Sequence, residues 1–426
     1  MTYEEAAEYI LNLPKFTKKN KPEHTKRFLW YLKNPQEHMK VLHVAGTNGK
    51  GSVCAYLQAM LLSEGKTAGM FTSPHLVRLN ERIAINEDMI TDEEFVEVFC
   101  LVLKAVRKME GEGLPHPTFF EFLFGMALCA FARAGVEYAV LETGLGGRLD
   151  ATNTVEHPLV SVITSIGMDH MEYLGNTLEE IAGEKAGILK EKVPVFFADS
   201  GEKSRRVIEK KAEEKHCSCK KIGKDAYEIL GIRDKHIAFS PVNAYYGNTP
   251  WKLRNTGLYQ AENAMLAMEV MRFLFGESGR PQRWREALAG VRREGRMEEI
   301  LRDIYIDGAH NVSAVEAFAE SVELSGQRCL LLFAAMQDKD YTEMIEILCK
   351  KVPADFYMVT AVGDKRTASP ETLAKIFQEN TDRPVLVEKS FAEAFACLRA
   401  RQDGRRIYCL GSLYLAGMIK ELIQEV

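Results

Sequence analysis

The sequence predicts an α/β protein in which a doubly wound, mostly parallel sheet domain precedes a smaller α/β domain. Short apolar runs of the β type alternate with longer helical runs through the first half of the chain. A glycine-rich loop lies between the first such run and the first long helical run. A second alternating series begins near residue 296. Alternation of this kind is typical of parallel sheets that helices cover on both faces.

The composition is that of a globular protein long enough for two or three domains. Its 426 residues are 46% hydrophobic and 27% charged, and the formal net charge is −5. This charge provides no basic field for a nucleic acid. No apolar run approaches the roughly 18 residues that a membrane span needs, and the acidic N-terminus argues against a secretory signal. We therefore expect a cytoplasmic protein that binds neither nucleic acid nor membrane.

The nine cysteines are scattered, and only "HCSC" at 216–219 places two of them close together. Structural zinc sites usually show a second ligand pair, which is missing here. We interpret the cysteines as unpaired thiols of a reduced protein.

The first domain follows from apolar runs and the helical runs between them. Strands are predicted at 40–46, 67–72, 137–144, 159–167 and 193–198, and helices at 52–65, 92–110, 119–135 and 178–190. Residues 223–260 contain only short apolar runs among polar residues, which predicts a small antiparallel or hairpin layer. A further helix is predicted at 260–276.

A glycine among charged residues, Gly295 in "RREGRMEE", suits a boundary between domains. We predict a first domain over 1–295 and a Rossmann-like α/β domain over 296–426. The strands of the second domain are predicted at 303–311, 329–336, 354–362, 384–389 and 406–414.

The loop "HVAGTNGKGSV" at 43–53 predicts a phosphate-binding site. Its glycines let backbone amides approach phosphate oxygens, Lys50 adds a positive charge, and the following helix directs its positive end at the anion. The alternative is a glycine-rich turn without a ligand. The loop departs from the pattern G-x-x-x-x-G-K-[ST], because Gly51 stands where that pattern has a hydroxyl for magnesium.

The missing hydroxyl directs attention to other strand ends, where open α/β sheets bind ligands. Ser73 follows the second predicted strand, Glu142 ends the third, and Asp169 and His170 follow the fourth. A hydroxyl, a carboxylate and an imidazole can hold Mg²⁺ together with phosphate oxygens and water. Each residue alone also has a structural reading, as a turn residue, a solvated strand end or a polar group at a helix start. Their shared position at strand ends favours the metal site.

Several motifs together resemble the folylpolyglutamate synthases and the bifunctional dihydrofolate synthase/folylpolyglutamate synthases, which belong to the Mur-ligase superfamily. The motifs are "HVAGTNGKGSV", "FTSPHLVRLNERIAIN", "LETGLGGRLDATN", "SIGMDHMEYLGNTLEEIAGEKAGILK", "QAENAMLA", "GRMEE", "DGAHN" and "GSLYLAG". The resemblance runs from about residue 16 to the C-terminus. "GTNGK" marks the superfamily, whereas "TSPHL", "EKAGI" and "DGAHN" are more specific to the folate branch.

The resemblance implies a set of site residues. In the first domain Gly49, Lys50, Gly51 and Ser52 match the ATP phosphate loop, Ser73, Glu142 and His170 match magnesium ligands, and Lys185 matches a carbamylated lysine that bridges toward a second magnesium ion. Further along the chain Asn263 matches a residue near adenine, Arg296 a phosphate contact, Asp307 a ribose contact and His310 a residue that faces the reaction centre. Arg82 and Ser412 are expected to contact the substrates. Without the resemblance, Lys185 reads as a surface lysine and Asp307 as a helix cap.

The resemblance implies an ATP-dependent ligase that adds L-glutamate to a folate, and also to dihydropteroate in the bifunctional case, through an acyl phosphate. ATP, Mg²⁺ and small-molecule acids would be its ligands, and a monomer is expected. Two departures from the family, Glu87 and Phe124, concern the pterin side. The alternatives are a ligase for a cell-wall muramyl peptide and a nucleotide-binding module without ligase activity.

Overall fold

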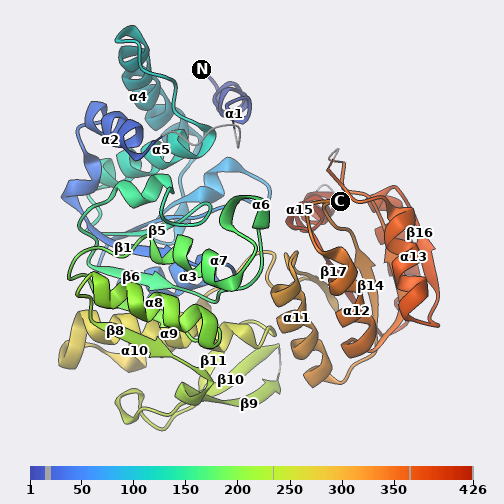
Figure 1. Cartoon of the computed structure of the whole chain (residues 1–426). Helices are drawn as coiled ribbons and strands as arrows, with labels where there is room; N and C mark the ends of the chain where they lie inside the picture. Colours follow the sequence, from blue (N-terminus) through green and yellow to red (C-terminus); the bar gives the residue numbers. More distant parts are fainter. Residues whose placement is uncertain (15–20, 234, 364–365, 425–426) are drawn as a thin grey trace.

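The computed structural model describes residues 1–14, 21–233, 235–363 and 366–424, so the start of the family resemblance at 16–20 lies outside the described residues. Figure 1 shows a larger part and, beside it, a smaller C-terminal part in orange and red. The larger part holds an eight-stranded sheet in the order β4-β3-β2-β5-β1-β6-β7-β8. Its strands are β1 (Lys40–Ala45), β2 (Ala68–Phe71), β3 (Ile83–Ile85), β4 (Asp88–Met89), β5 (Tyr138–Glu142), β6 (Val160–Ile163), β7 (Val195–Ala198) and β8 (Cys219–Ile222).

This sheet confirms the predicted doubly wound, mostly parallel architecture. Strands β2, β5, β1, β6, β7 and β8 pair in parallel, and β3 with β4 forms an antiparallel edge. The five predicted strands are present. The sequence analysis missed β3, β4 and β8, because the first two are very short and "CKKI" of β8 is polar.

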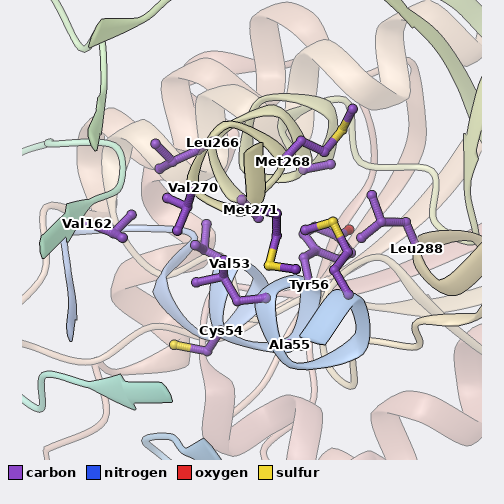
Figure 2. Packing of buried hydrophobic residues seen from close by; sticks show 14 of the residues in the cluster. Val53, Cys54, Ala55, Tyr56, Val162, Leu266, Met268, Val270, Met271 and Leu288 are labelled. Carbon is purple, nitrogen blue, oxygen red and sulfur yellow. The ribbon is translucent and has the colours of Figure 1, made fainter. Parts of the chain in front are cut away.

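Helices cover both faces of the large sheet, and successive residues of β1 face opposite cores. Leu42 and Val44 pack with α3 (Lys50–Ser63) and α9 (Tyr259–Phe275), whereas Val41 packs with α4 (Asp92–Gly111) and α5 (Phe119–Ala134). Figure 2 shows Val53 and Tyr56 of α3 close to Val270 and Met271 of α9. The remaining helices of this part are α1 (Tyr3–Leu11), α2 (Pro22–Tyr31), α6 (Met171–Leu174), α7 (Leu178–Ala186), α8 (Glu202–Glu214) and α10 (Pro281–Gly290). The packing of α3 against α9 fixes the helix start that follows the glycine-rich loop.

Four of these helices begin with the same local signal. A Thr-x-x-Glu capping box opens α1 at Thr2, α4 at Thr91, α5 at Thr118 and α7 at Thr177, with each threonine hydroxyl accepting from the backbone N–H three residues on. Such a box satisfies backbone donors that a helix start otherwise leaves free. It therefore sets where α7 begins and which of its residues face the sheet.

The predicted antiparallel layer is confirmed as a three-stranded sheet of β9 (Tyr227–Arg233), β10 (His236–Pro241) and β11 (Trp251–Leu253). Phe239 and Trp251 of this layer pack into the same core as α9 and α10. The layer thus supports α9 from the side away from the large sheet.

The C-terminal part is a second α/β unit, as predicted, with a six-stranded sheet in the order β12-β13-β17-β14-β15-β16. Its strands are β12 (Glu298–Leu301), β13 (Ile304–Ile306), β14 (Cys329–Phe333), β15 (Ala354–Val359), β16 (Val385–Val387) and β17 (Arg406–Leu410). Among the described strands of this sheet, β12 and β13 pair antiparallel and the other neighbours pair in parallel. Helices α11 (Val312–Ser325), α12 (Tyr341–Lys351) and α13 (Pro370–Asn380) cover one face, and α14 (Phe391–Ala400) and α15 (Leu413–Gln424) the other.

The predicted boundary at residue 295 falls in the segment 291–297, which joins α10 to β12. Gly295 has a φ of +60° there, in the left-handed region that glycine adopts readily. The division at this residue stays a prediction. In the described part of the chain, every helix is too short or too polar to cross a membrane.

His43 on β1 predicts that the fold loses stability in acid. Its side chain is fully buried, and burial together with the charge of Lys190 lowers the pKa of His43 to about 3. The Thr152 hydroxyl donates to Asp150 and accepts from His43 Nε2 at 2.8 Å, so Nδ1 is the site left for a proton. Nδ1 is buried and has no hydrogen-bond partner.

The folded pKa of His43 lies below the unfolded value of about 6.5, so the unfolded chain takes up the proton first as the pH falls. We expect the free energy of unfolding to decrease between about pH 6.5 and pH 3, and His43→Gln to reduce that dependence. Urea unfolding at several pH values measures it. The control His38→Gln changes an exposed histidine and should keep the wild-type loss. Equal pH dependence in wild type and His43→Gln would contradict the prediction.

Candidate active site

The glycine-rich loop 46–51 connects the carboxyl end of β1 to α3 at the centre of the large sheet. Gly46 and Gly49 have φ values of +149° and +89°. A Cβ atom on Gly46 would lie 1.8 Å from Thr164 Oγ1, and one on Gly49 would lie 2.2 Å from Asn263 Oδ1. Both positions therefore require glycine. Lys50 Nζ donates to the carbonyl oxygens of Gly46 and Thr47, each at 3.1 Å, and so folds back over the loop.

The predicted metal ligands lie at or after the carboxyl ends of three strands near β1. Glu142 is the last residue of β5, Ser73 follows β2, and His170 follows β6. The backbone N–H of Ser73 donates to Glu142 Oε2 at 3.0 Å, which brings these two residues together. His170 has a φ of +50° and stands immediately before α6.

Lys50 links these groups electrostatically. Burial raises the pKa of Glu142, and the charge of Lys50 is the largest influence that opposes this rise. Burial is the main cause that lowers the pKa of His170 to about 4; the charge of Asp169 opposes this shift, and the charge of Lys50 makes a small contribution to it. At neutral pH His170 is therefore a neutral imidazole, the form that can bind a metal ion.

Lys185 on α7 is an internal residue, which corrects the reading of it as a surface lysine. It is 3% exposed, and its Nζ donates to the Gly46 carbonyl oxygen at 2.8 Å. Burial lowers the pKa of Lys185 to about 7, and the nearby charge of Lys50 contributes to the shift. Lys50 and Lys185 thus contact the same carbonyl of the loop from two elements.

A polar network joins the loop to the C-terminal part. Asp169, after β6, accepts from Lys339 Nζ at 2.6 Å and from Asn311 Nδ2 at 2.9 Å. Burial by itself raises the pKa of Asp169, but the close contact with His310 and the charges of His310, His170 and Lys339 bring that pKa far below its ordinary value. Asp169 is therefore an ionised contact across the two parts.

Two residues extend this network to the centre of the site. Asn48 of the loop donates to Asn311 Oδ1 at 3.1 Å. His310 Nε2 lies 3.6 Å from Asp169 Oδ2, and its Nδ1 lies 2.7 Å from the Gly308 carbonyl oxygen. Because a carbonyl oxygen only accepts, Nδ1 carries a hydrogen, and the other ring nitrogen faces Asp169.

Four predicted nucleotide contacts have protein partners in the structure. Both oxygens of the buried Asp307 carboxylate accept hydrogen bonds, from the Tyr259 hydroxyl at 2.9 Å, Met297 N at 2.8 Å and Ala309 N at 2.7 Å. Arg296 Nη1 donates to the Gly295 carbonyl oxygen at 2.9 Å. The Ser52 hydroxyl is buried and accepts from Gln260 Nε2 at 3.2 Å, so its side chain faces α9. Asn263 Nδ2 donates to Gln260 Oε1 at 3.1 Å, from the same helix.

The two predicted substrate contacts are buried. Arg82 Nε donates to His75 Nδ1 at 2.8 Å, and its guanidinium lies 5.2 Å from the ring centroid of Phe119. Burial lowers the pKa of Arg82 to about 10, against the charge of Glu142. Ser412 Oγ accepts from Tyr414 N at 3.2 Å at the start of α15. Of the two departures from the family, Glu87 is exposed and Phe124 is fully buried in the core.

The comparisons with known proteins agree with this arrangement. Residues 117–271 match the Mur ligase middle domain, and residues 295–413 match the Mur ligase glutamate ligase domain. A dihydrofolate synthase/folylpolyglutamate synthase of Bacillus subtilis is 36% identical over 358 residues, which cover 81% of this chain and 82% of the relative. This chain belongs to the dihydrofolate synthase/folylpolyglutamate synthase family. It is thus an ATP-dependent amide ligase.

Solved structures of this synthase family extend over the whole chain. Folylpolyglutamate synthase of Mycobacterium tuberculosis, complexed with ADP and AMPPCP, has a TM-score of 0.88 at 27% identity and covers 99% of this chain and 98% of its own. The E. coli FolC structure in complex with DHPP and ADP has a TM-score of 0.83 at 26% identity and covers 100% of this chain and 98% of its own. The fold prediction is confirmed by these matches.

Arg293 was missed by the prediction from sequence, as were Asn48, Asn311 and Lys339 of the polar network. Arg293, in the segment between α10 and β12, places its Nη2 atom 2.7 Å from where a Cβ atom of Gly51 would stand. Glu142 Oε2 lies 3.2 Å from the same point. The glycine at position 51 was the signal available in the sequence, because a residue without a side chain leaves space beside the loop for a side chain from elsewhere. The arginines at 292 and 293 were interpreted only as part of a boundary, whereas Arg296 was predicted as a phosphate contact.

Proposed function

We propose that this chain uses ATP to join L-glutamate to the carboxylate of a folate. The observation that carries the proposal is the convergence on one loop of Lys50, Glu142 and Lys185 from the larger part and Asn311 from the C-terminal part. Family membership supports a ligase, and the relatives are named for two acceptors. We therefore propose dihydropteroate as a second acceptor, with dihydrofolate as the product.

The residues present fit a magnesium ion that arrives with the nucleotide. Mg²⁺ is usually held by one or two carboxylates together with phosphate oxygens and water. Glu142 supplies one buried carboxylate, and its only hydrogen bond among the described residues comes from Ser73 N. In the described part of the chain, no three His, Cys, Asp or Glu side chains come together in a way that could hold a metal without other ligands. Ser73, Glu142 and His170 would therefore hold the ion together with phosphate oxygens and water, and the ion would neutralise charge on the transferred phosphoryl group.

Phosphoryl transfer is the first step of the proposed reaction. A carboxylate oxygen of the folate attacks the γ-phosphorus, the bond from that phosphorus to the bridging oxygen breaks, and ADP leaves. Lys50 and the start of α3 bind the phosphates, because the helix end and the ammonium group attract anions. The chain contributes mainly position and charge to this step.

Amide formation follows in the proposal. The glutamate amine attacks the acyl carbon, phosphate leaves with the electron pair of the C–O bond, and the amine loses a proton. The contacts of Asp169 with Lys339, Asn311 and His310 hold the C-terminal part against the loop. This contact excludes water, which would otherwise hydrolyse an acyl phosphate. We propose that a single chain performs both steps as a monomer.

Lys185 is proposed to carry a carbamate that supplies an oxygen ligand toward a second magnesium ion. An ammonium group cannot bind a cation, so the uncharged amine must first attack carbon dioxide, form an N–C bond and release a proton. Its pKa of about 7 leaves a large fraction of the amine uncharged at neutral pH. Its burial beside the Gly46 carbonyl oxygen places the product at the loop.

ADP release tests the proposed function. We expect release only when ATP, L-glutamate and a pteroyl acid are all present, with a product heavier by one glutamate residue in mass spectra. Tetrahydrofolate and dihydropteroate, each offered as the sole acceptor, distinguish the two acceptors. ADP release that does not depend on glutamate would disprove ligation and favour the nucleotide-binding module. Turnover with a muramyl peptide in place of both pteroyl acids would favour the cell-wall alternative.

A further inference from the structure

Arg293 lies over the first turn of α3 although it belongs to a distant segment. It comes from the coil between α10 and β12, in the segment that connects the two parts of the chain. A Cβ atom on Gly51 would meet Arg293 Nη2 at 2.7 Å, which is closer than real Cβ contacts. Gly51 does not have a positive φ, so the end of the arginine side chain rather than the backbone occupies the space of a side chain there.

The guanidinium of Arg293 lacks a hydrogen-bonding partner. Its Nε atom is buried and has no acceptor, and among the described residues no hydrogen bond or ion pair to its other nitrogens is found. A buried donor that has lost water without gaining an acceptor costs folding free energy. Burial lowers the pKa of Arg293, the charge of Arg296 lowers it further, and the charge of Glu142 opposes both. Arg293 is half-buried, and its buried Nε–H without an acceptor is unfavourable for a residue that only stabilises the fold.

The surroundings of Arg293 carry excess positive charge. Its neighbours Lys50 and Arg296 also act on the carboxyl of Glu142, whose pKa is raised mainly by burial. Asp307, the other nearby carboxylate, already accepts three hydrogen bonds from Tyr259, Met297 and Ala309. Lys50, Arg293 and Arg296 are thus three cations near Glu142, and this carboxylate alone does not balance their charge. A bound polyanion would balance this charge.

We propose that Arg293 binds the terminal phosphates of the nucleotide, in the place that a hydroxyl at residue 51 would otherwise face. This inference rests on the proposed function, which supplies the nucleotide. In the pattern G-x-x-x-x-G-K-[ST] the residue after the lysine points at the metal and phosphates rather than at the base. Arg293 Nη2 fills the space that the side chain of a residue at position 51 would enter. A planar guanidinium with several donors suits two phosphate oxygens at once.

The location of Arg293 would let a bound nucleotide act on the segment that joins the two parts of the chain. Arg293 and Arg296 both belong to the segment 291–297, which joins the two parts. Binding of the terminal phosphates by this segment would fix its position relative to the loop. Nucleotide binding would thereby favour the arrangement in which His310 and Asn311 approach Asp169 and Asn48.

A series of nucleotides with increasing phosphate number tests the inference by binding alone. Adenosine, AMP, ADP and AMPPCP are titrated calorimetrically into wild type and Arg293→Ala, in EDTA and again with magnesium. We expect affinity for ADP and AMPPCP to fall about 10- to 100-fold, as for loss of a hydrogen bond to a charged group. AMP should lose less, and adenosine should change less than about twofold.

Matched variants separate this role from a structural one. Arg292→Ala removes the neighbouring arginine, which is exposed, and should leave all four affinities unchanged. Arg293→Lys keeps a positive charge and should recover part of the affinity for ADP. Arg293→Gln keeps a polar side chain and serves if Arg293→Ala does not fold, with thermal unfolding as the check on both.

Two results would overturn the inference. Equal losses for adenosine and AMPPCP would show that Arg293 contacts the base or only supports the fold. Unchanged affinity for AMPPCP in both Arg293→Ala and Arg293→Gln would show that it contacts no phosphate. The proposed function is tested separately, since wild-type ADP release must still require glutamate and a pteroyl acid. If wild type binds nucleotides but performs no ligation, the proposed function fails and the phosphate contact stands.

Discussion

Lys185→Ala should abolish ligation while leaving the protein folded. The wild-type amine is buried and donates a single hydrogen bond, to the Gly46 carbonyl oxygen. Burial lowers its pKa to about 7, so holding it protonated below that value costs folding free energy. Alanine removes both this cost and the proposed carbamate. We expect the rate of ADP release to fall by at least about 10²-fold, the size of effect seen when groups that stabilise transition-state charge are lost.

The pH dependence of carbamylation follows from the same shift. In the unfolded chain the lysine has a pKa of about 10.4, so between that value and about 7 the folded state favours the uncharged amine. Raising the pH through about 7 therefore increases the amine available to carbon dioxide, and lowering it decreases the carbamate. NMR of the protein in ¹³C-bicarbonate should show a carbamate signal that disappears in Lys185→Ala. The signal should weaken below about pH 7.

Lys190→Ala is the matched control for Lys185→Ala. Lys190 follows the same helix, is partly buried, has a pKa lowered by burial, and donates to a backbone carbonyl, that of Asn153, at 2.8 Å. Its contact lies away from the loop, so Lys190→Ala should keep the rate of ADP release. Short carboxylates such as acetate should partly restore Lys185→Ala by replacing the carbamate oxygen. Full activity of Lys185→Ala without any addition would contradict the carbamate.

The sequence allowed the fold to be predicted because its signals are local. Apolar runs marked β1, β2, β5, β6 and β7, and the glycine-rich loop marked the junction of β1 and α3. Strand β8 escaped because "CKKI" has no apolar run, and its pairing with β7 depends on the finished sheet. Parallel pairing partners are far apart in the chain, so a polar edge strand leaves little trace in its own residues.

The site was predictable only where residues follow strands. Glu142 and His170 were identified by that position, whereas Arg293 lies in a coil that tertiary structure alone brings to Gly51. The burial of Lys185 could not be read from "GEKAGI", because a lysine on a helix is exposed in most contexts. Asp169 shows the same limit, since Lys339 and Asn311 reach it from the C-terminal part.

Glu142→Gln should remove activity without reducing stability, which would identify Glu142 as a functional carboxylate. Burial raises its pKa, so keeping it charged at neutral pH costs folding free energy. Glutamine keeps an oxygen that can accept from Ser73 N, which donates to Glu142 Oε2 at 3.0 Å in wild type. It removes the negative charge that would hold magnesium and that faces Lys50 and Arg293. We expect ADP release to fall by at least about 10²-fold, with an unchanged or higher midpoint of thermal unfolding.

Glu137→Gln provides the comparison for Glu142→Gln from the same region of the sheet. Glu137, just before β5, accepts from Lys40 Nζ at 3.0 Å at the surface, and this hydrogen bond lowers its pKa. Its carboxylate is therefore stabilised by a cation at the opposite end of the strand from the loop. Glu137→Gln should keep the rate of ADP release, and its midpoint should change little because the two ion pairs lost, with Lys40 and Lys66, lie at the surface. If Glu142→Gln retained a tenth or more of wild-type turnover at saturating magnesium, Glu142 would not be a metal ligand. A fall in its unfolding midpoint as large as that of a core substitution would instead assign the residue to the fold, because a carboxylate whose pKa is raised by burial predicts the opposite sign.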